Sequence, residues 1–218
     1  MSHRDDELPG VESMATVRHR IGPADHGRKM TLEEFWEAEE QPGHLYELAR
    51  GVLEVSEVPG DSHDQVVDNL HEAFSTHRRL HPNLILRIGH GSDVRYIIPE
   101  LGTDWHPDLA VVFRGEMQRD FRGRLLPVLG VEIVSAGSRA RQRDYVDKRE
   151  DYLAVGLLEY WIVDPELRQV TVLARREVDG VTSWEGRTFR DGAVIASELL
   201  PEFVGTVAEL WADADDED

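Results

Sequence analysis

Residues 125–165 read LLPVLGVEIVSAGSRARQRDYVDKREDYLAVGLLEYWIVDP, and this stretch determines the fold class. Its two apolar runs, residues 125–135 and 157–165, have the length and the branched residues that are typical of buried strands. Residues 139–155 between them have helical spacing and end at Gly156, a residue that commonly terminates helices. A strand, a helix and a second strand in this order predict a parallel crossover within a mixed sheet. We therefore expect an α/β fold.

The flanking sequence adds further helices and strands. Thr31 and Glu34 form a capping-box pattern at the start of a short helix, and residues 62–80 carry apolar residues at helical spacing. Alternating or continuous apolar residues between turn signals predict the remaining strands. They cover a hairpin over residues 45–58 that turns at Arg50 and Gly51, and residues 83–89, 93–99, 104–113, 168–177 and 182–190. A short helix is expected over residues 207–212.

The two ends of the chain lack these patterns. Residues 1–29 have no apolar period, which predicts a disordered or loosely attached segment, and residues 212–218 form an acidic tail. We expect residues 30–211 to form one domain. No stretch reaches the roughly 18 apolar residues of a membrane span, and the N-terminus lacks a secretory signal. These features favour a cytoplasmic protein without membrane contact.

Composition restricts the chemistry that the chain can perform. The 218 residues include no cysteine, which excludes disulfides, thiolate zinc sites and thiol nucleophiles. Any bound metal must therefore be held by oxygen or imidazole. Such a ligand set favours hard cations, Mg²⁺ first and Mn²⁺ as an alternative.

Two carboxylates fall among apolar neighbours in adjacent predicted strands. Asp108 lies in HPDLAVV and Glu132 lies in VEIVS, 24 positions later. Burying a carboxylate costs several kcal/mol unless the charge is paired, so two of them in neighbouring strands suggest a shared cation. Alternatively, each carboxylate lies at a strand end and pairs with a nearby arginine.

The following helix contributes a candidate cation. Asp144, Lys148 and Tyr152 are spaced four apart and should share one stripe of the helix that follows the Glu132 strand. Lys148 could then reach over the end of that strand. The alternative is an ordinary surface ion pair between Asp144 and Lys148, which is a weak and common interaction.

The order of these motifs resembles the Uma-two restriction endonuclease family of the PD-(D/E)xK nuclease superfamily. The resemblance covers about residues 30–173 and rests on ordered motifs: YEL at residues 46–48, a histidine at position 63, HPDLAVV, VEIVS and DYVDKREDYLAVGLLEYWIVDP. It implies a restriction-endonuclease-like mixed β-sheet flanked by helices, with a metal site at one end of the sheet. It also implies a metal-dependent endonuclease that hydrolyses phosphodiester bonds of nucleic acid, with DNA as the expected substrate.

The resemblance assigns roles to individual residues. Asp108 matches the first aspartate and Glu132 the acidic residue of the (D/E)xK half-motif, whereas Val134 stands where that half-motif has lysine. The resemblance implies that Lys148 supplies the missing amine from the next helix. The expected catalytic residues are Asp108, Glu132, Lys148 and Glu47. The expected Mg²⁺ ligands are the carboxylates of Asp108, Glu132 and Glu47 and the backbone carbonyl of Ile133. His63 and Tyr152 belong to the expected site without an assigned role.

Charge makes nucleic-acid binding a demanding function for this chain. The formal net charge is −19, but residues 114–149 carry nine basic and five acidic residues, so this window is +4 and the remainder −23. We expect weak DNA binding through Arg139, Arg141 and Arg143 in this window. The alternative is that the basic window is an ordinary solvated surface.

Two other functions remain open from the sequence. The domain could keep a nuclease fold and bind nucleic acid or protein without cleavage, or it could hydrolyse a small phosphoester with a metal. We also expect a homodimer with two-fold symmetry, in which residues 157–165 and the later strands supply contact surface.

Overall fold

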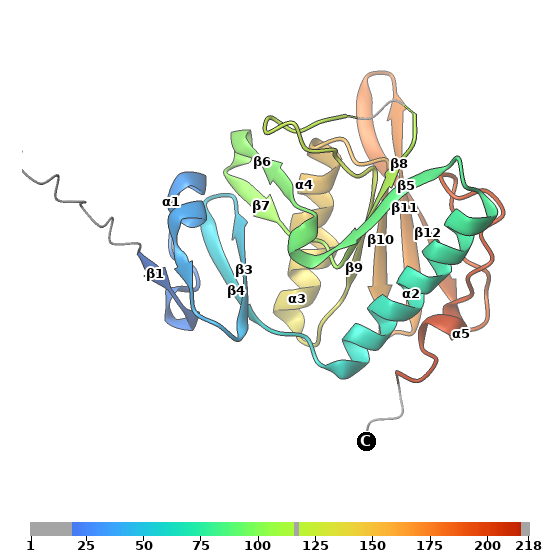
Figure 1. The fold of residues 1–218 in the computed structure, drawn as a ribbon, viewed down its shortest axis with the longest axis horizontal. Helices are drawn as coiled ribbons and strands as arrows, with labels where there is room; N and C mark the ends of the chain where they lie inside the picture. The colour runs from blue at the N-terminus through green and yellow to red at the C-terminus, as the bar shows by residue number, and fades with distance from the viewer. Residues whose placement is uncertain (1–18, 116–117, 215–218) are drawn as a thin grey trace, which may run out of the picture.

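The computed structural model describes residues 19–115 and 118–214, and its largest element is a mixed six-stranded sheet (Figure 1). β9 and β10 are parallel and pair Leu129 with Glu159, which confirms the predicted crossover. The other neighbouring strands in this sheet are antiparallel. In spatial order the strands are β12 (Val181–Arg190), β11 (Gln169–Val178), β10 (Glu159–Asp164), β9 (Leu129–Ile133), β8 (Leu109–Phe113) and β5 (Ile85–His90).

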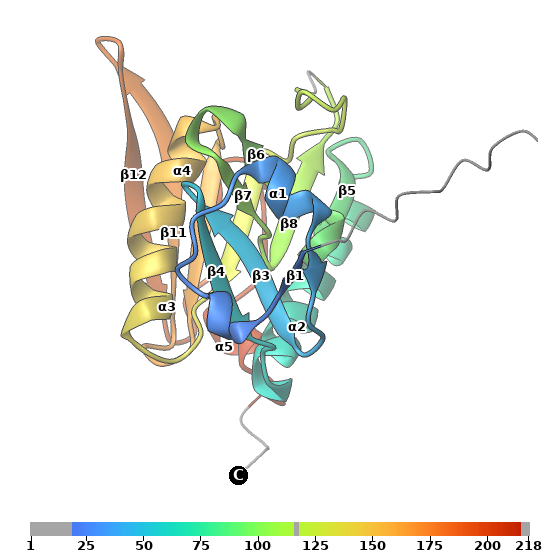
Figure 2. The same cartoon turned by 90° about the vertical axis from the view of Figure 1, so that its left-hand side faces the viewer.

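The side chains of β10 alternate between the two faces of this sheet and show which helix covers each face. Trp161 and Val163 share a hydrophobic core with helix α2 (Asp61–Leu80), whereas Tyr160 and Ile162 pack with Tyr152 of helix α4 (Lys148–Ala154). Successive strand residues point to opposite faces, so α2 and α4 cover opposite sides of the sheet, as Figure 2 shows. All six residues of β10 are buried, because both neighbouring strands and both faces cover it.

A second sheet has four strands and lies on the α4 side. Its order is β4 (Val52–Glu57), β3 (His44–Ala49), β7 (Thr103–Trp105) and β6 (Tyr96–Ile98). β3 and β4 form the predicted hairpin, and Arg50 and Gly51 at its turn both have positive φ.

The predicted strand over residues 104–113 is divided between the two sheets. β7 belongs to the four-stranded sheet and β8 to the six-stranded sheet, and residues 106–108 connect them. Pro107 lies in this connection and has no N–H to donate to a strand partner, which explains why the strand is interrupted there. Asp108 consequently lies at the junction of the two sheets.

The ordered part of the chain begins before Thr31. Ile21 is fully buried in a small core with Phe35, although we expected residues 19–29 to be loosely attached. Residues 1–18 of that segment and residues 215–218 of the acidic tail lie outside the described residues. The elements of this region are β1 (Arg20–Ile21), η1 (Pro23–Asp25), α1 (Leu32–Glu37) and β2 (Glu39–Glu40).

The crossover helix contains a widened turn. It runs as α3 (Ser138–Gln142), a π-helical segment η4 (Arg143–Asp147) and α4, and the Lys148 N–H donates to the carbonyl of Arg143 five residues earlier. Such π turns are rare and are frequently found at functional sites. The remaining helices are η2 (Gly91–Asp93), η3 (Pro99–Leu101) and α5 (Val207–Leu210). No helix of the described residues is long and apolar enough to cross a membrane.

Candidate functional site

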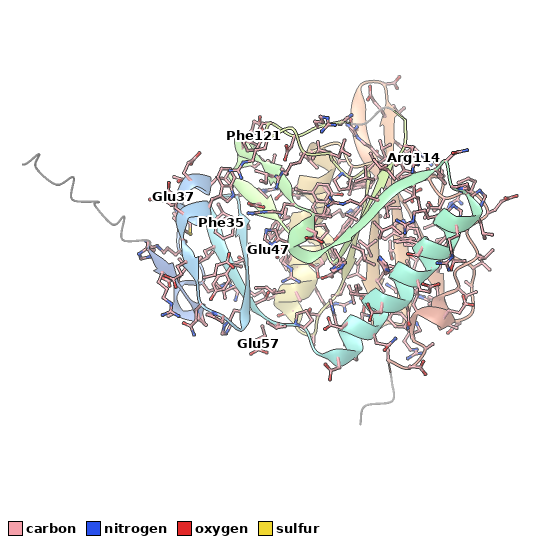
Figure 3. All side chains as sticks on the ribbon, viewed as in Figure 1. Phe35, Glu37, Glu47, Glu57, Arg114 and Phe121 are labelled. Atoms are coloured by element: carbon pink, nitrogen blue, oxygen red, sulfur yellow. The ribbon has the colours of Figure 1, made fainter. Side chains whose placement is uncertain are left out.

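The predicted site residues converge where the two sheets meet the crossover helix. Glu47 comes from β3, Glu132 from β9 and Lys148 from α4, while Asp108 precedes β8. Figure 3 labels Glu47 near the middle of the molecule, between the N-terminal elements and the six-stranded sheet. Segments separated by up to about a hundred residues of sequence therefore supply one cluster, which we call the carboxylate cluster: Glu47, Asp108, Glu132 and Lys148.

Lys148 lies at the centre of the carboxylate cluster. Its side chain is 2% exposed, and its Nζ lies 2.8 Å from Glu132 Oε2 and 3.0 Å from Glu47 Oε1. Burial alone would lower the pKa of Lys148, but the two carboxylates outweigh burial and raise it above its ordinary value. The side chain is therefore a buried ammonium ion. The geometry excludes the exposed Asp144–Lys148 surface pair that the helical spacing also allowed.

Glu132 is held from two sides. Lys148 donates to one carboxylate oxygen, and the Tyr152 hydroxyl donates to the other at 2.6 Å. Burial raises the pKa of Glu132 well above its ordinary value, and the negative charges of Asp108, Asp144 and Glu47 act in the same direction, whereas Lys148 opposes them. Tyr152, which had no assigned role from the sequence, thus fixes the orientation of Glu132.

Asp108 is oriented by the backbone of β9 and by a histidine. The Ile133 N–H donates to Asp108 Oδ2 at 2.7 Å, and His63 Nε2 lies 3.4 Å from the same oxygen. Burial raises the pKa of Asp108, but His63, Lys148 and the Ile133 hydrogen bond outweigh burial and lower it. In turn, Asp108 raises the pKa of His63 against the opposite effect of burial.

Glu47 completes the group of carboxylates. Its Oε1 accepts a hydrogen bond from the backbone N–H of His106 at 2.8 Å, in addition to its contact with Lys148. Burial raises the pKa of Glu47, but Lys148 and Arg143 outweigh burial and lower it. Glu47 therefore remains ionised beside the lysine.

The carboxylate cluster forms the floor of an open cavity, which we call the inner cavity. Its volume is about 330 Å³, and His63, His106 and Arg143 line it together with the carboxylate cluster. This volume lies near the lower end of the range of about 300–1,000 Å³ that small-molecule sites occupy. The inner cavity is thus large enough for a small ligand beside the carboxylates.

The three arginines that we expected to bind nucleic acid have different surroundings. Arg139 is 66% exposed, with its Nε 3.7 Å from Glu54, and Arg141 pairs with Asp164 at 2.7 Å and with Glu166 at 3.2 Å. Arg143 is only 17% exposed and lines the inner cavity. The three residues therefore do not form one solvated basic surface.

Sequence reasoning missed the position of Arg143 and its partner Asp144. Arg143 donates to both carboxylate oxygens of Asp144, which is fully buried. Ordinary helical spacing relates a residue to its neighbours three and four positions away, and Arg143 is five positions from Lys148. The π turn that brings both residues to the cavity leaves no signal in that spacing.

The donor chemistry of the cluster fits a hard divalent cation. Glu47, Asp108, Glu132 and the Ile133 carbonyl supply oxygen only, which Mg²⁺ and Mn²⁺ prefer. The negative charges of Asp108, Asp144 and Glu47 raise the pKa of Glu132, and a bound cation would relieve this repulsion. Within residues 19–115 and 118–214 no three His, Asp or Glu side chains are gathered at metal-binding spacing, and Lys148 and Tyr152 donate to the Glu132 oxygens.

Comparison with known proteins gives one family and one fold. The model of the family Uma2, described as "Putative restriction endonuclease", matches residues 32–208. A solved structure described as "a putative nuclease belonging to DUF820 from Anabaena variabilis ATCC 29413" is 18% identical with a TM-score of 0.65, and the match covers 85% of this chain and 99% of that chain. This likeness confirms the expected restriction-endonuclease-like mixed sheet with flanking helices. No curated protein matches.

Proposed function

Since the chain belongs to the Uma2 family, we propose that the carboxylate cluster hydrolyses phosphodiester bonds of nucleic acid, with DNA as the substrate and a divalent cation as cofactor. One observation supports this proposal above the others. Two carboxylates from different strands and a lysine from the following helix meet at the floor of the inner cavity. This combination of acidic ligands and a buried amine suits metal-assisted hydrolysis of an anionic ester.

Some groups of the site would hold the cation, and Lys148 would compensate negative charge on the phosphate. Asp108, Glu132, the Ile133 carbonyl and Glu47 would hold the cation, which when bound polarises the phosphate and lowers the pKa of a coordinated water. Tyr152 and the Ile133 N–H keep the Glu132 and Asp108 carboxylates in place before any ligand arrives. Lys148 supplies a fixed positive charge beside the position at which negative charge develops on the phosphate.

The absence of lysine from position 134 does not remove this chemistry. Val134 is 5% exposed and packs with Tyr96, Trp105 and Tyr152 behind the site. The Lys148 ammonium reaches Glu132 from the helix instead. This contact favours hydrolysis over the alternative of a nuclease fold that only binds its partner.

Nicking of supercoiled plasmid tests the proposed activity. We expect the wild type to convert plasmid to the open-circular form with Mg²⁺ or Mn²⁺ and to lose this activity in EDTA. Asp108→Asn should reduce the rate by at least about 100-fold, because it removes one negative ligand for the cation. The exposed carboxylate Asp61 provides a matched control, and Asp61→Asn should nick like the wild type. Metal-independent nicking, or an active Asp108→Asn, would contradict the proposal.

We also propose that the protein forms a homodimer, although the expected contact surface is wrong in part. β10 is buried inside the sheet and is unavailable to a second copy. β12 is the outermost strand and pairs only with β11 among the described strands, and Val178 and Val181 at the tip of this hairpin are 65% and 66% exposed. Such an edge is the natural site for pairing with another chain. Light scattering at micromolar concentration should give twice the mass of the chain; a monomeric mass would refute the dimer.

A further inference from the structure

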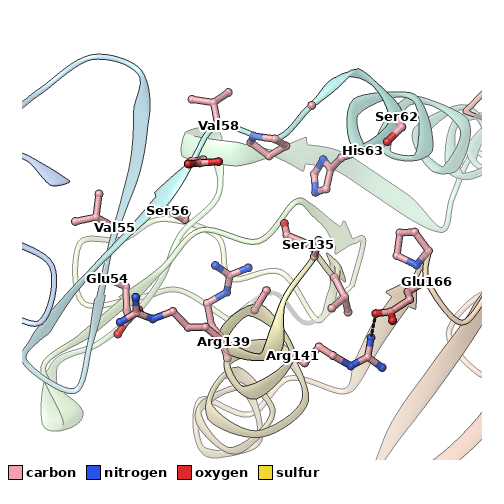
Figure 4. Close-up of a pocket in the computed structure, with 18 residues that line it drawn as sticks. Glu54, Val55, Ser56, Val58, Ser62, His63, Ser135, Arg139, Arg141 and Glu166 are labelled. Atoms are coloured by element: carbon pink, nitrogen blue, oxygen red, sulfur yellow. Dashed lines mark hydrogen bonds and ion pairs between the residues drawn. The ribbon is translucent and has the colours of Figure 1, made fainter. Parts of the chain in front are cut away.

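A second and larger cavity adjoins the inner cavity, and we call it the outer cavity. Its volume is about 600 Å³, and it lies between residues 54–63, residues 134–143 and the turn after β10 (Figure 4). Figure 4 shows Ser56, Val58 and His63 on one side of this space, opposite Arg139 and Arg141. The residues that line both cavities are Ser56, Glu57, Pro59, His63, Ser135 and Arg143. The two cavities therefore adjoin each other along these six residues.

Arg143 is the cation at the junction of the two cavities. Its Nε donates to Asp144 Oδ1 at 2.8 Å, and its Nη2 lies 3.3 Å from Oδ2. In the part of the chain that the structure describes, its remaining N–H groups have no protein partner, although the residue is only 17% exposed. A guanidinium fixed along one edge keeps its other edge available for two oxygens of an anion such as a phosphate.

The other two arginines of the outer cavity are already paired. Arg139 faces Glu54, and Arg141 is shared between Asp164 and Glu166, so a phosphate would have to compete with these carboxylates. Arg143 donates hydrogen bonds to one carboxylate, that of the buried Asp144, which occupies one edge of the guanidinium only, while Glu47 and Glu132 act on it through space. Among the three, Arg143 is thus best prepared to bind a phosphate.

The walls of the outer cavity suit a sugar and a base better than a second phosphate. Val55, Val58, Val134, Pro59 and Pro165 supply apolar surface, and serine hydroxyls lie between them at positions 56, 62 and 135. Glu54, Glu57 and Glu166 also line the space and would repel a free anion there. Apolar surface with a few hydrogen-bonding groups is the usual setting for an organic ligand.

We infer that the outer cavity is a subsite for the nucleotide next to the scissile bond, and that Arg143 binds the phosphate between the two cavities. The inference rests on the proposed nuclease function and adds the path of the substrate strand. The scissile phosphate lies over the carboxylate cluster in the inner cavity, and the flanking sugar and base occupy the outer cavity. Arg143 is a positioning residue on this path, separate from the residues that hold the cation.

Binding of a labelled single-stranded oligonucleotide, measured by anisotropy with Ca²⁺ in place of Mg²⁺, tests the subsite without cleavage. Arg143→Gln should weaken binding at least about fivefold and reduce the log–log salt slope by about 0.7 unit, the effect of one lost phosphate contact on a single strand. Arg143→Lys should restore part of the affinity. Arg78→Gln is the charge-matched control and should change affinity less than about twofold, because Arg78 is exposed on α2 and lines neither cavity.

A cavity-filling variant tests the nucleotide part of the inference separately. Ala140 lines the outer cavity and not the inner one, so Ala140→Phe should weaken oligonucleotide binding while leaving the binding of inorganic phosphate unchanged. Arg143→Gln should weaken both. Arg143→Gln leaves the buried Asp144 carboxylate without its partner, and this can destabilise the protein. In that case the test is repeated with the double variant Arg143→Gln/Asp144→Asn, which also removes the buried charge.

The outcomes separate this inference from the proposed activity. Wild-type nicking together with unchanged oligonucleotide binding in Arg143→Gln or in Ala140→Phe would overturn the subsite and leave hydrolysis standing. The expected binding differences without any nicking would support the subsite and refute hydrolysis. Failure of the wild type to bind the oligonucleotide at all would overturn the subsite as well.

Discussion

Lys148 is the residue on which the electrostatics of the site depend. Its ammonium lies within 3.0 Å of both Glu47 and Glu132, so it already compensates the carboxylates that would receive a divalent cation. The lysine and the cation therefore attract the same oxygens and repel each other. Lys148 both stabilises the site without a metal and limits how tightly the metal binds.

Replacement of Lys148 by methionine should strengthen metal binding while it removes catalysis. Two unit charges about 4 Å apart at an effective dielectric of 20 interact by about 4 kcal/mol, and a third of that corresponds to about tenfold in the dissociation constant. We expect calorimetric titration with Mn²⁺ to give a dissociation constant at least about tenfold lower for Lys148→Met than for the wild type. The exposed Lys29 is the matched control, and Lys29→Met should bind Mn²⁺ like the wild type. Weaker Mn²⁺ binding in Lys148→Met would show that the lysine and the metal use different oxygens.

At the scale of single residues, the sequence predicted most of the residues that gather at the site. The spacing of Asp108 and Glu132 in buried strands and the helical stripe through Lys148 and Tyr152 predicted that these residues lie together, and in the structure they do. Their roles in catalysis and metal binding stay predictions. Arg143 was predicted to bind nucleic acid, but its place beside the carboxylate cluster was not predicted. Its distance of five positions from Lys148 has meaning only inside a π turn, and residue spacing does not reveal such a turn.

At the scale of elements, one buried aspartate joins several segments around the four-stranded sheet. Asp104 in β7 is fully buried and accepts hydrogen bonds from Trp36 of α1 at 2.7 Å and from Arg95 before β6 at 2.9 Å. It therefore links three segments of the N-terminal half and supports the strand that leads to Asp108. Burial raises the pKa of Asp104, but the bonds to His106, Arg95 and Trp36 outweigh burial and lower it.

Asp104→Asn should remove stability that depends on pH. Because the pKa of Asp104 is lower in the folded than in the unfolded state, its stabilising effect is complete above the unfolded value of about 3.9 and is lost as pH falls through the folded value. We expect the variant to lose about 1.5–3 kcal/mol of unfolding free energy at neutral pH, the size of a charged hydrogen bond. Urea titrations between neutral and acidic pH should show the two proteins converging below about pH 4. A difference that does not change with pH would refute the assignment.

Element boundaries were predictable where local signals stand alone. The capping box at Thr31, the hairpin turn at Arg50 and Gly51 and the long apolar pattern of α2 all appear as expected. The division of residues 104–113 between two sheets was not predictable, because the sequence of both halves together is typical of one apolar strand. Only tertiary pairing, with β3 and β6 on one side and β5 and β9 on the other, separates them.

Net charge dominates the behaviour of the whole molecule towards a polyanion. The chain carries −19, so long-range repulsion opposes DNA binding, and attraction must come from positive charge within a Debye length of about 8 Å at physiological salt. The structure leaves Arg143 as the best-prepared arginine for this purpose, because Arg139 and Arg141 face carboxylates. Binding should consequently be weak and involve few phosphate contacts.

Deletion of residues 213–218 should strengthen DNA binding. It removes five acidic residues, and the gain should be largest at low salt, where repulsion between distant charges is least screened. Anisotropy titrations of the inactive Asp108→Asn protein, with and without these residues, would measure it across a salt series. Equal affinities at every salt concentration would show that the acidic tail does not influence the DNA-binding surface.

The central claim, that the carboxylate cluster performs the hydrolysis, is tested most directly by two buried glutamates in neighbouring strands. Glu132 of β9 belongs to the cluster, whereas Glu159 of β10 accepts bonds from Trp161, Ser197 and the Glu198 N–H away from it. Plasmid nicking with Mg²⁺ should fall at least about 100-fold in Glu132→Gln, while Glu159→Gln, although less stable, should nick like the wild type under conditions where it remains folded. Retained nicking in Glu132→Gln, or an equal loss in both folded variants, would contradict the claim.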